Sequence, residues 1–230
     1  TIPRPDAGTT LTDFFLPGTQ QQTITDTIPN PLECASCHTE PIYNKWRGSM
    51  MSQAARDPLM WAALHVANND APNVGDYCLR CHTPKAWLEG RSHPADGSAL
   101  TEEDEFSGVA CEVCHRLVDP VASTSLTDEM ISIDAGIRAA LTTTLPSDYV
   151  GSAMMIIDPL DRRRGPFDVD PLGHQAYQSD FLSQSLVQTT TYIAQARMCG
   201  TCHNVDNPTL SWNENPPNGA PPQYLSLIHI

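Results

Sequence analysis

Five-residue Cys-x-x-Cys-His motifs are the part of this sequence best suited to chemistry, and they occur four times. They span residues 34–38, 78–82, 111–115 and 199–203, and together they contain all eight cysteines of the chain. Two thiols at this spacing can reach the two vinyl groups of one porphyrin and form thioethers, and the imidazole that follows can bind the iron. The pattern is therefore typical of covalent c-type haem attachment.

This interpretation assigns eight thioether sulfurs and four proximal iron ligands. The sulfurs are those of Cys34, Cys37, Cys78, Cys81, Cys111, Cys114, Cys199 and Cys202, and the proximal ligands are His38, His82, His115 and His203. Disulfides and structural zinc are the alternative uses of closely spaced cysteines. Neither requires a histidine after each second cysteine, so the sequence predicts four covalently bound haem c groups.

The second axial ligand of each iron decides between electron transfer and substrate chemistry, because only an open iron can bind a substrate. The histidines outside the motifs alternate with them along the chain, which favours bis-histidine ligation; these candidates are His65, His93, His174 and His229. His65 and His174 are the preferred distal ligands, since each adjoins apolar residues able to cover a porphyrin. Met51 and Met50 rank lower because helical methionines are more often core residues.

The composition limits both the partners and the core. The formal net charge is −14, and a field of this sign repels phosphate backbones, so nucleic-acid binding is excluded. Leu, Ile, Val and Phe make up about 20% of the chain, close to the limit below which a chain cannot pack its own core. Porphyrins would supply the missing apolar surface, and we expect the chain to unfold without them. No apolar run approaches the roughly 18 residues of a membrane span.

The expected fold is mainly α with extensive loops and little β, its short helices wrapped around four haems. Apolar residues recur at i+4 from Ile42 to Ala54, and Asp57 with Pro58 is a typical helix start, predicting a helix to about residue 68. Helices are also expected at 75–82, after the capping sequence that begins at Thr101, at 125–141 and at 178–195. Residues 152–157 are a short strand candidate.

The expected organisation is an extended N-terminal arm (1–33), a tetrahaem domain (34–208) and an irregular C-terminal tail (209–230). The arm and the tail are candidates for docking on adjacent subunits. Arg162–Arg164 is the one basic cluster, interpreted either as a partner of haem propionates or as a solvated turn. Because haem c is attached outside the cytoplasm and the chain begins at Thr1, we expect an exported protein whose leader has been removed, periplasmic or extracellular.

The motifs and their flanking residues resemble multihaem c-type cytochromes of the cytochrome c554-like group, which includes tetrahaem cytochromes that polymerise into extracellular filaments. The matching segments are 46–51, 75–82, 87–92, 96–100, 163–167 and 199–208. Relatives often place a distal histidine in a W-x-x-S-x-H pattern, and this chain has Met51 at that position. The last residues, Leu225–Ile230, resemble a translated sequencing adapter, which weakens the case for His229.

Electron transfer is the predicted function, and no catalytic side chain is expected because the cofactor carries the reaction. The expected partners are redox proteins or extracellular acceptors, together with further copies of the chain in a conductive filament. A soluble periplasmic shuttle is the alternative within this class. A multihaem oxidoreductase for small nitrogen or sulfur compounds is the alternative outside it, and a high-spin ferric signal would favour that enzyme. A structural zinc protein would instead be colourless.

Overall fold

Short helices joined by long irregular segments form the computed structural model, which describes residues 8–121, 128–143, 145, 150–165 and 192–205. The α-helices in these ranges are α1 (Pro31–His38), α2 (Asn44–Arg47), α3 (Met50–Gln53), α4 (Pro58–Asp70), α5 (Gly75–His82), α6 (Pro84–Leu88), α7 (Glu102–Ser107), α8 (Cys111–His115), α9 (Asp128–Ala139) and α11 (Ala196–His203). Single turns of tighter or wider helix are η1 (Leu11–Phe14), η2 (Thr39–Tyr43), η3 (Ala54–Arg56) and η5 (Tyr192–Ala194). Within the described ranges β structure is limited to isolated bridges, such as Leu117 with Ile157. The expected mainly helical fold with extensive loops is confirmed.

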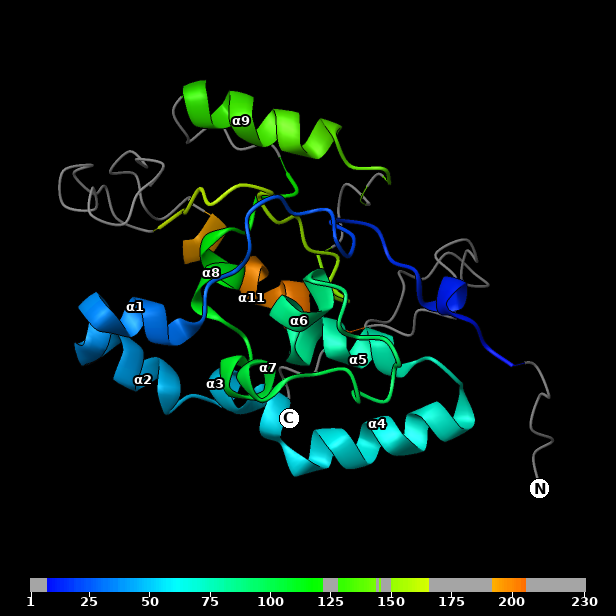
Figure 1. Cartoon of the computed structure of the whole chain (residues 1–230). Coiled ribbons are helices and arrows are strands. Elements are labelled where there is room, and N and C mark those ends of the chain that lie inside the picture. The colour runs from blue at the N-terminus through cyan, green and yellow to red at the C-terminus, as the bar shows by residue number, and fades with distance from the viewer. Residues whose placement is uncertain (1–7, 122–127, 144, 146–149, 166–191, 206–230) are drawn as a thin grey trace.

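The helices α5, α6, α8 and α11 gather in the middle of the molecule (Figure 1), and α4 and α9 lie at opposite edges. The segment 8–30 is almost free of helix, yet it packs on this centre. Its backbone amides at Thr19 and Gln22 donate to the carbonyls of Met155 (2.8 Å) and Leu88 (2.7 Å). Its apolar side chains Phe14, Leu16 and Ile28 are buried. The described part of the N-terminal arm is therefore held by its own chain.

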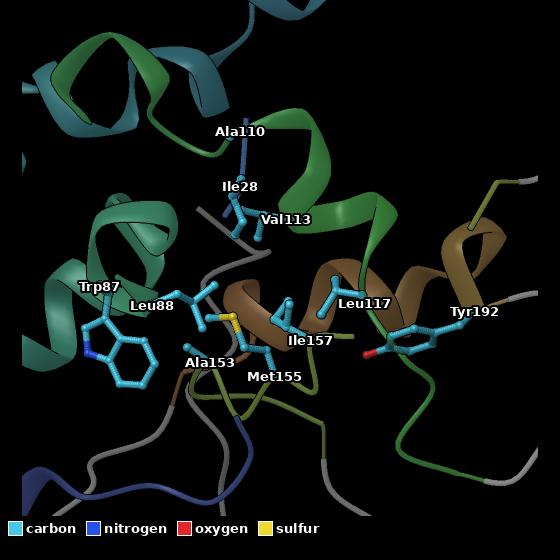
Figure 2. Packing of buried hydrophobic residues seen from close by; sticks show 10 residues of the cluster. All are labelled: Ile28, Trp87, Leu88, Ala110, Val113, Leu117, Ala153, Met155, Ile157 and Tyr192. Atoms are coloured by element: carbon cyan, nitrogen blue, oxygen red, sulfur yellow. The ribbon is translucent and has the colours of Figure 1, made fainter. Parts of the chain in front are cut away.

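The largest core cluster joins segments that lie far apart in the sequence (Figure 2). Its buried members are Ile28, Trp87, Leu88, Ala110, Val113, Leu117, Ala153, Met155, Ile157 and Tyr192. Val113 belongs to the third cysteine motif, and the partly buried Cys81 and Met198 pack against the cluster. Burying a large apolar side chain is worth about 1.5–3 kcal/mol, so this core fixes three of the four motif helices relative to one another.

The helix starts predicted from capping residues are confirmed. The Asp57 carboxylate accepts a hydrogen bond from the amide of Leu59 (2.9 Å), with Pro58 in the first turn of α4. Thr101 and Asp104 form a reciprocal capping box at the start of α7. These side chains accept hydrogen bonds from first-turn amides that have no partner within the helix. The local sequence was therefore sufficient to locate the starts of α4 and α7.

The helical pattern from Ile42 to Ala54 corresponds to several short helical segments and not to one continuous helix. The chain breaks at Gly48, whose amide bonds back to the carbonyl of Asn44, and the Ser49 hydroxyl caps a new helix by accepting from the amide of Ser52. The i+4 series is consequently split between faces, and Ile42 is 56% exposed and Met50 78% exposed. A local cap has outweighed the periodicity.

The predicted strand at 152–157 is also wrong. Ser152 and Ala153 have φ angles of 51° and 55°, in the left-handed region, which interrupts an extended chain. The segment contributes only the bridge at Ile157. The helix expected at 125–141 is confirmed as α9, whereas most of the helix expected at 178–195 lies outside the described residues.

A bidentate ion pair ties the loop after α6 to the start of α7. Arg91 Nε and Nη2 donate to the two oxygens of Asp104 at 2.8 and 2.6 Å, and the Asp104 side chain is 0% exposed. Burial by itself would raise the pKa of Asp104, but hydrogen bonds from Arg91 and Thr101 outweigh it and hold that pKa below its ordinary value. The folded state therefore favours the ionised carboxylate.

We expect Asp104→Asn to lower the free energy of unfolding by about 2 kcal/mol at neutral pH, because it weakens charge-assisted hydrogen bonds in a buried site. A carboxylate with a lowered folded pKa stabilises the fold above its unfolded pKa of about 3.9, and this contribution is lost as the pH falls through the folded pKa. Denaturant titrations at several pH values should show the difference between variant and wild type shrinking below about pH 4. A difference that does not change with pH contradicts the ion-pair explanation.

Candidate functional site

Each Cys-x-x-Cys-His motif lies on a helix that ends at the motif histidine, and these helices are α1, α5, α8 and α11. In α8 the motif is the whole helix. Residues three and four apart on a helix lie on one face, so both sulfurs and the imidazole of each motif are offered on the same side. The helical geometry thus presents the donor set that a single porphyrin needs.

The cysteine sulfurs of different motifs meet in pairs. The thiols of Cys34 and Cys111 share a hydrogen bond, which brings the first motif against the third. The thiols of Cys81 and Cys202 share another, which brings the second motif against the fourth. In both pairs the contact between sulfurs disfavours a second thiolate, and it raises the pKa of Cys111 and of Cys202.

A third thiol lies close to one of these pairs. Burial, together with electrostatic repulsion from the nearby thiols of Cys202 and Cys199, raises the pKa of Cys114 to about 12. The third motif therefore lies beside the fourth. The four motifs, which are separated by long stretches of sequence, form one contiguous series in space.

Two proximal histidines are held by backbone carbonyls. His115 Nδ1 lies 2.7 Å from the carbonyl oxygen of Arg164, and His82 Nδ1 lies 3.1 Å from that of Ala54. A carbonyl can only accept, so Nδ1 carries the proton and Nε2 keeps a lone pair for a metal. Burial lowers the pKa of His115, which favours the neutral imidazole that metal binding requires.

The basic cluster Arg162–Arg164 supports this arrangement instead of facing solvent. Its ion pairs with carboxylates are Arg162 with Asp158, Arg163 with Glu112 and Asp161, and Arg164 with Asp134 and Asp158. The Arg164 side chain is almost fully buried, and its carbonyl is the one that orients His115. The expectation of a solvated turn is therefore wrong, and the carboxylates that these arginines meet belong to the chain itself.

The residues present fit haem c. All eight cysteines are free thiols, as thioether formation requires, and the two oriented imidazoles leave Nε2 available. Within the described ranges no group of three or more His, Cys, Asp or Glu side chains is arranged to hold a metal ion directly. When bound, haem supplies reversible one-electron chemistry at iron, and the chain supplies attachment, orientation and charge.

A cavity of about 440 Å³ lies beside the first motif helix. It is lined by Asn30, Pro31, Leu32, Tyr43, Trp46, Arg47, Ser52, Gln53, Arg56 and Phe106. Three aromatic rings and two guanidinium groups make this lining both apolar and cationic. Arg56 stacks on Phe106 at 4.4 Å, and its Nε is buried without a hydrogen-bond partner among the described residues. The lining suits a flat apolar group with an acidic edge, which is the chemistry of a porphyrin.

The candidate distal ligands have different surroundings. His65 is exposed on α4. His93 is partly exposed, and its Nε2 lies 3.4 Å from Asp76 Oδ1 and 3.3 Å from Gln21 Nε2. His174 and His229 lie outside the described residues. Both methionine candidates, Met50 and Met51, are on α3 with exposed side chains.

Sequence reasoning missed a polar network at the start of the second motif helix. The Asp76 carboxylate accepts from Ser92 Oγ (2.5 Å), Gln21 Nε2 (2.9 Å) and Trp87 Nε1 (3.2 Å). Asp76 and Trp87 both fall in segments that resemble the cytochrome c554-like group, which was the available signal. Their pairing follows from the α5–α6 turn and is not visible in the local pattern.

Sequence reasoning also missed Arg80, which lies between the two cysteines of the second motif. It is 2% exposed, donates to the carbonyls of Leu16 (3.2 Å) and Pro17 (2.9 Å), and stacks on the Trp87 ring at 4.3 Å. Burial lowers the pKa of Arg80 to about 10, so it remains charged at neutral pH. Arginine side chains are usually exposed, so the sequence gave no indication that Arg80 is buried.

The motif helices thus present paired thiols, and two of them present oriented imidazoles, which are the donors that covalent haem attachment requires. Residues 33–116 match the family of cytochrome c554 and c-prime. The match covers the first three motifs and less than half of the chain, and it supports a c-type electron-transfer protein with covalently bound haem c. No curated protein and no solved structure matches the chain significantly. None of the described helices is long and apolar enough to cross a membrane.

The distal role of His65 remains a prediction. We expect His65→Ala in the ferric holoprotein to open one iron, producing a high-spin component and binding of cyanide, because loss of a strong axial ligand frees the sixth position. Electron paramagnetic resonance and cyanide difference spectra measure both effects. His93→Ala serves as the comparison variant, because it removes a histidine whose side chain already lies beside the Asp76 carboxylate. An unchanged low-spin spectrum in His65→Ala would assign the ligand elsewhere.

Proposed function

We propose that this chain is an exported electron carrier that binds four haem c groups and has no substrate-converting site of its own. The observation that carries the proposal is the proximity of the motif sulfurs, which comprises two sulfur contacts between motifs and the close approach of Cys114 to the fourth motif. Haem groups attached at neighbouring sulfurs have adjacent edges, and closely spaced haems pass electrons by hopping. The match to the cytochrome c554 and c-prime family supports the same chemistry.

The contacts favour the spatial order of motifs one, three, four and two. Cys34 meets Cys111, Cys114 lies beside Cys199 and Cys202, and Cys202 meets Cys81. This order differs from the order along the chain, because the long segment between the third and fourth motifs returns α11 to the centre. The first and second motifs are then the two ends of the electron path.

The first motif is the more accessible end. Cys37 and His38 are exposed, and Leu32 on the same helix is 62% exposed. An exposed, partly apolar haem edge suits contact with a redox protein, an extracellular acceptor or a second copy of the chain. We propose a conductive filament as the assembled form, in which ends of successive copies meet. Negative-stain images of the purified holoprotein would show filaments, and uniform single particles would favour the soluble shuttle.

The haem count is tested by the pyridine haemochrome assay together with protein-bound iron. We expect four haems per chain in the wild type and three in any variant that lacks both cysteines of one motif. Loss of colour on denaturation and gel filtration would show that haem is not covalent. A count below four in the wild type would overturn the proposal.

The spatial order is tested by removing single haems. Cys111→Ala with Cys114→Ala deletes the third haem and should leave the first haem magnetically isolated, giving an uncoupled low-spin signal in the oxidised protein. Cys78→Ala with Cys81→Ala deletes an end of the path and should leave the remaining three haems coupled. An uncoupled signal in both variants would support an order that follows the sequence, because the first deletion would then isolate the fourth haem and the second deletion would isolate the first haem.

A further inference from the structure

Arg80 is a buried positive charge that no carboxylate of the described residues contacts directly. It is 2% exposed, and its two terminal nitrogens donate to the carbonyls of Leu16 and Pro17. Within the described part of the chain no ion pair includes it, whereas Arg91 and Arg164 are both paired. Burying a charge without an ionic partner costs several kcal/mol, which the two carbonyl hydrogen bonds and the contact with the Trp87 ring offset in part.

The position of Arg80 relates this charge to two attachment sites. It directly precedes Cys81 in the second motif, and its charge interacts with the thiols of Cys81 and of Cys202 in the fourth motif. Its Nε is buried and has no hydrogen-bond partner among the described residues. The Nε–H donor of the guanidinium is therefore left for a group that the described residues do not supply, at the junction of the second and fourth motifs.

We infer that Arg80 sets the reduction potentials of the haems attached at the second and fourth motifs, raising them above the value they would have without its charge. This inference rests on the proposed function. Reduction adds one negative charge to a haem, and a fixed positive charge in a poorly hydrated site stabilises the reduced form. If Nε–H binds a propionate, the sign is the same, since removing Arg80 then leaves that carboxylate uncompensated.

Replacing Asp76 provides a second test, in which the haem potentials should shift in the direction opposite to that expected for Arg80→Gln. Its carboxylate interacts with the Arg80 charge and is held by Ser92, Gln21 and Trp87. Asp76→Asn keeps the shape and the acceptor oxygen but removes the negative charge. It should therefore raise the potentials that Arg80→Gln lowers.

The experiment is a spectroelectrochemical titration of the holoprotein for wild type, Arg80→Gln, Arg80→Lys and Asp76→Asn. Lys45→Gln is the matched control, because it removes a charge that is exposed on α2 and screened by solvent. For Arg80→Gln we expect at least a tenfold fall in the reduction equilibrium constant of one or two haems, which is about 59 mV for one electron. Arg80→Lys should retain more than half of the wild-type effect, and Lys45→Gln should leave every midpoint unchanged.

The outcomes separate this inference from the proposed function. Four haems per chain with unchanged midpoints in both Arg80→Gln and Asp76→Asn overturns the role of Arg80 and leaves the electron carrier intact. A wild-type count other than four overturns the proposed function itself. If Arg80→Gln does not fold, Asp76→Asn decides, because a midpoint that fails to rise contradicts the inference.

Discussion

Replacing Cys78 and Cys81 by alanine is expected to remove one haem and to lower the free energy of unfolding by about 4 kcal/mol, a fall in Tm of roughly 10 °C. The second motif lies deep in the protein: Leu79 and Arg80 are buried, and the partly buried Cys81 packs against the main core. A haem attached here replaces apolar surface that the aliphatic-poor sequence does not provide. The haemochrome assay measures the loss, and differential scanning calorimetry measures the Tm.

The matched control is the same double replacement in the first motif, at Cys34 and Cys37. It also deletes one haem, but Cys37 and His38 are exposed, so less apolar burial depends on that haem. We expect a Tm decrease less than half as large. Equal decreases in the two variants, or a native Tm after loss of the second haem, would contradict the idea that this porphyrin is part of the core.

Gly75→Ala is expected to destabilise the protein by about 3 kcal/mol and to reduce haem occupancy at the second motif. A Cβ atom at this position would lie 1.8 Å from the carbonyl oxygen of Ala95 and 2.7 Å from Asn68 Nδ2. The Asn68 side chain also bridges the two segments, accepting from the Gly75 amide (2.9 Å) and donating to the Ala95 carbonyl (2.8 Å). Because backbone is the obstacle, relief requires α5 to move.

Gly136→Ala in α9 is the control, since nothing lies within 4 Å of a Cβ atom built there. A glycine inside an exposed helix costs about 0.5–1 kcal/mol relative to alanine, so this variant should be stabilised by that amount. Urea unfolding of both variants gives the two free energies. If Gly75→Ala proved as stable as the wild type, the close approach of α4, α5 and the loop at Ala95 would be refuted.

Local sequence was sufficient where a short-range interaction determines the structure. The caps at Asp57 and Thr101 satisfy amides within three residues of themselves, so the starts of α4 and α7 were predictable. The i+4 repeat from Ile42 to Ala54 did not predict the break at Gly48. The helix cap at Ser49 competes with the hydrophobic periodicity, and the periodicity alone does not show that the cap is the stronger effect. The expected strand at 152–157 failed because contacts with distant segments fix its backbone; the Ala153 amide, for example, donates to the Thr201 carbonyl.

The sequence by itself determined the chemistry of the site, because a thioether and a proximal ligand need only residues within one five-residue motif. It also determined that the fold would be helical and poor in aliphatic core. Only the tertiary structure decided which motifs adjoin, that Arg164 and Ala54 orient the proximal histidines, and that Arg80 is buried between two attachment sites. Each of these depends on residues brought together from distant parts of the chain, and charge burial in particular is a property of the packed surroundings and not of the residue.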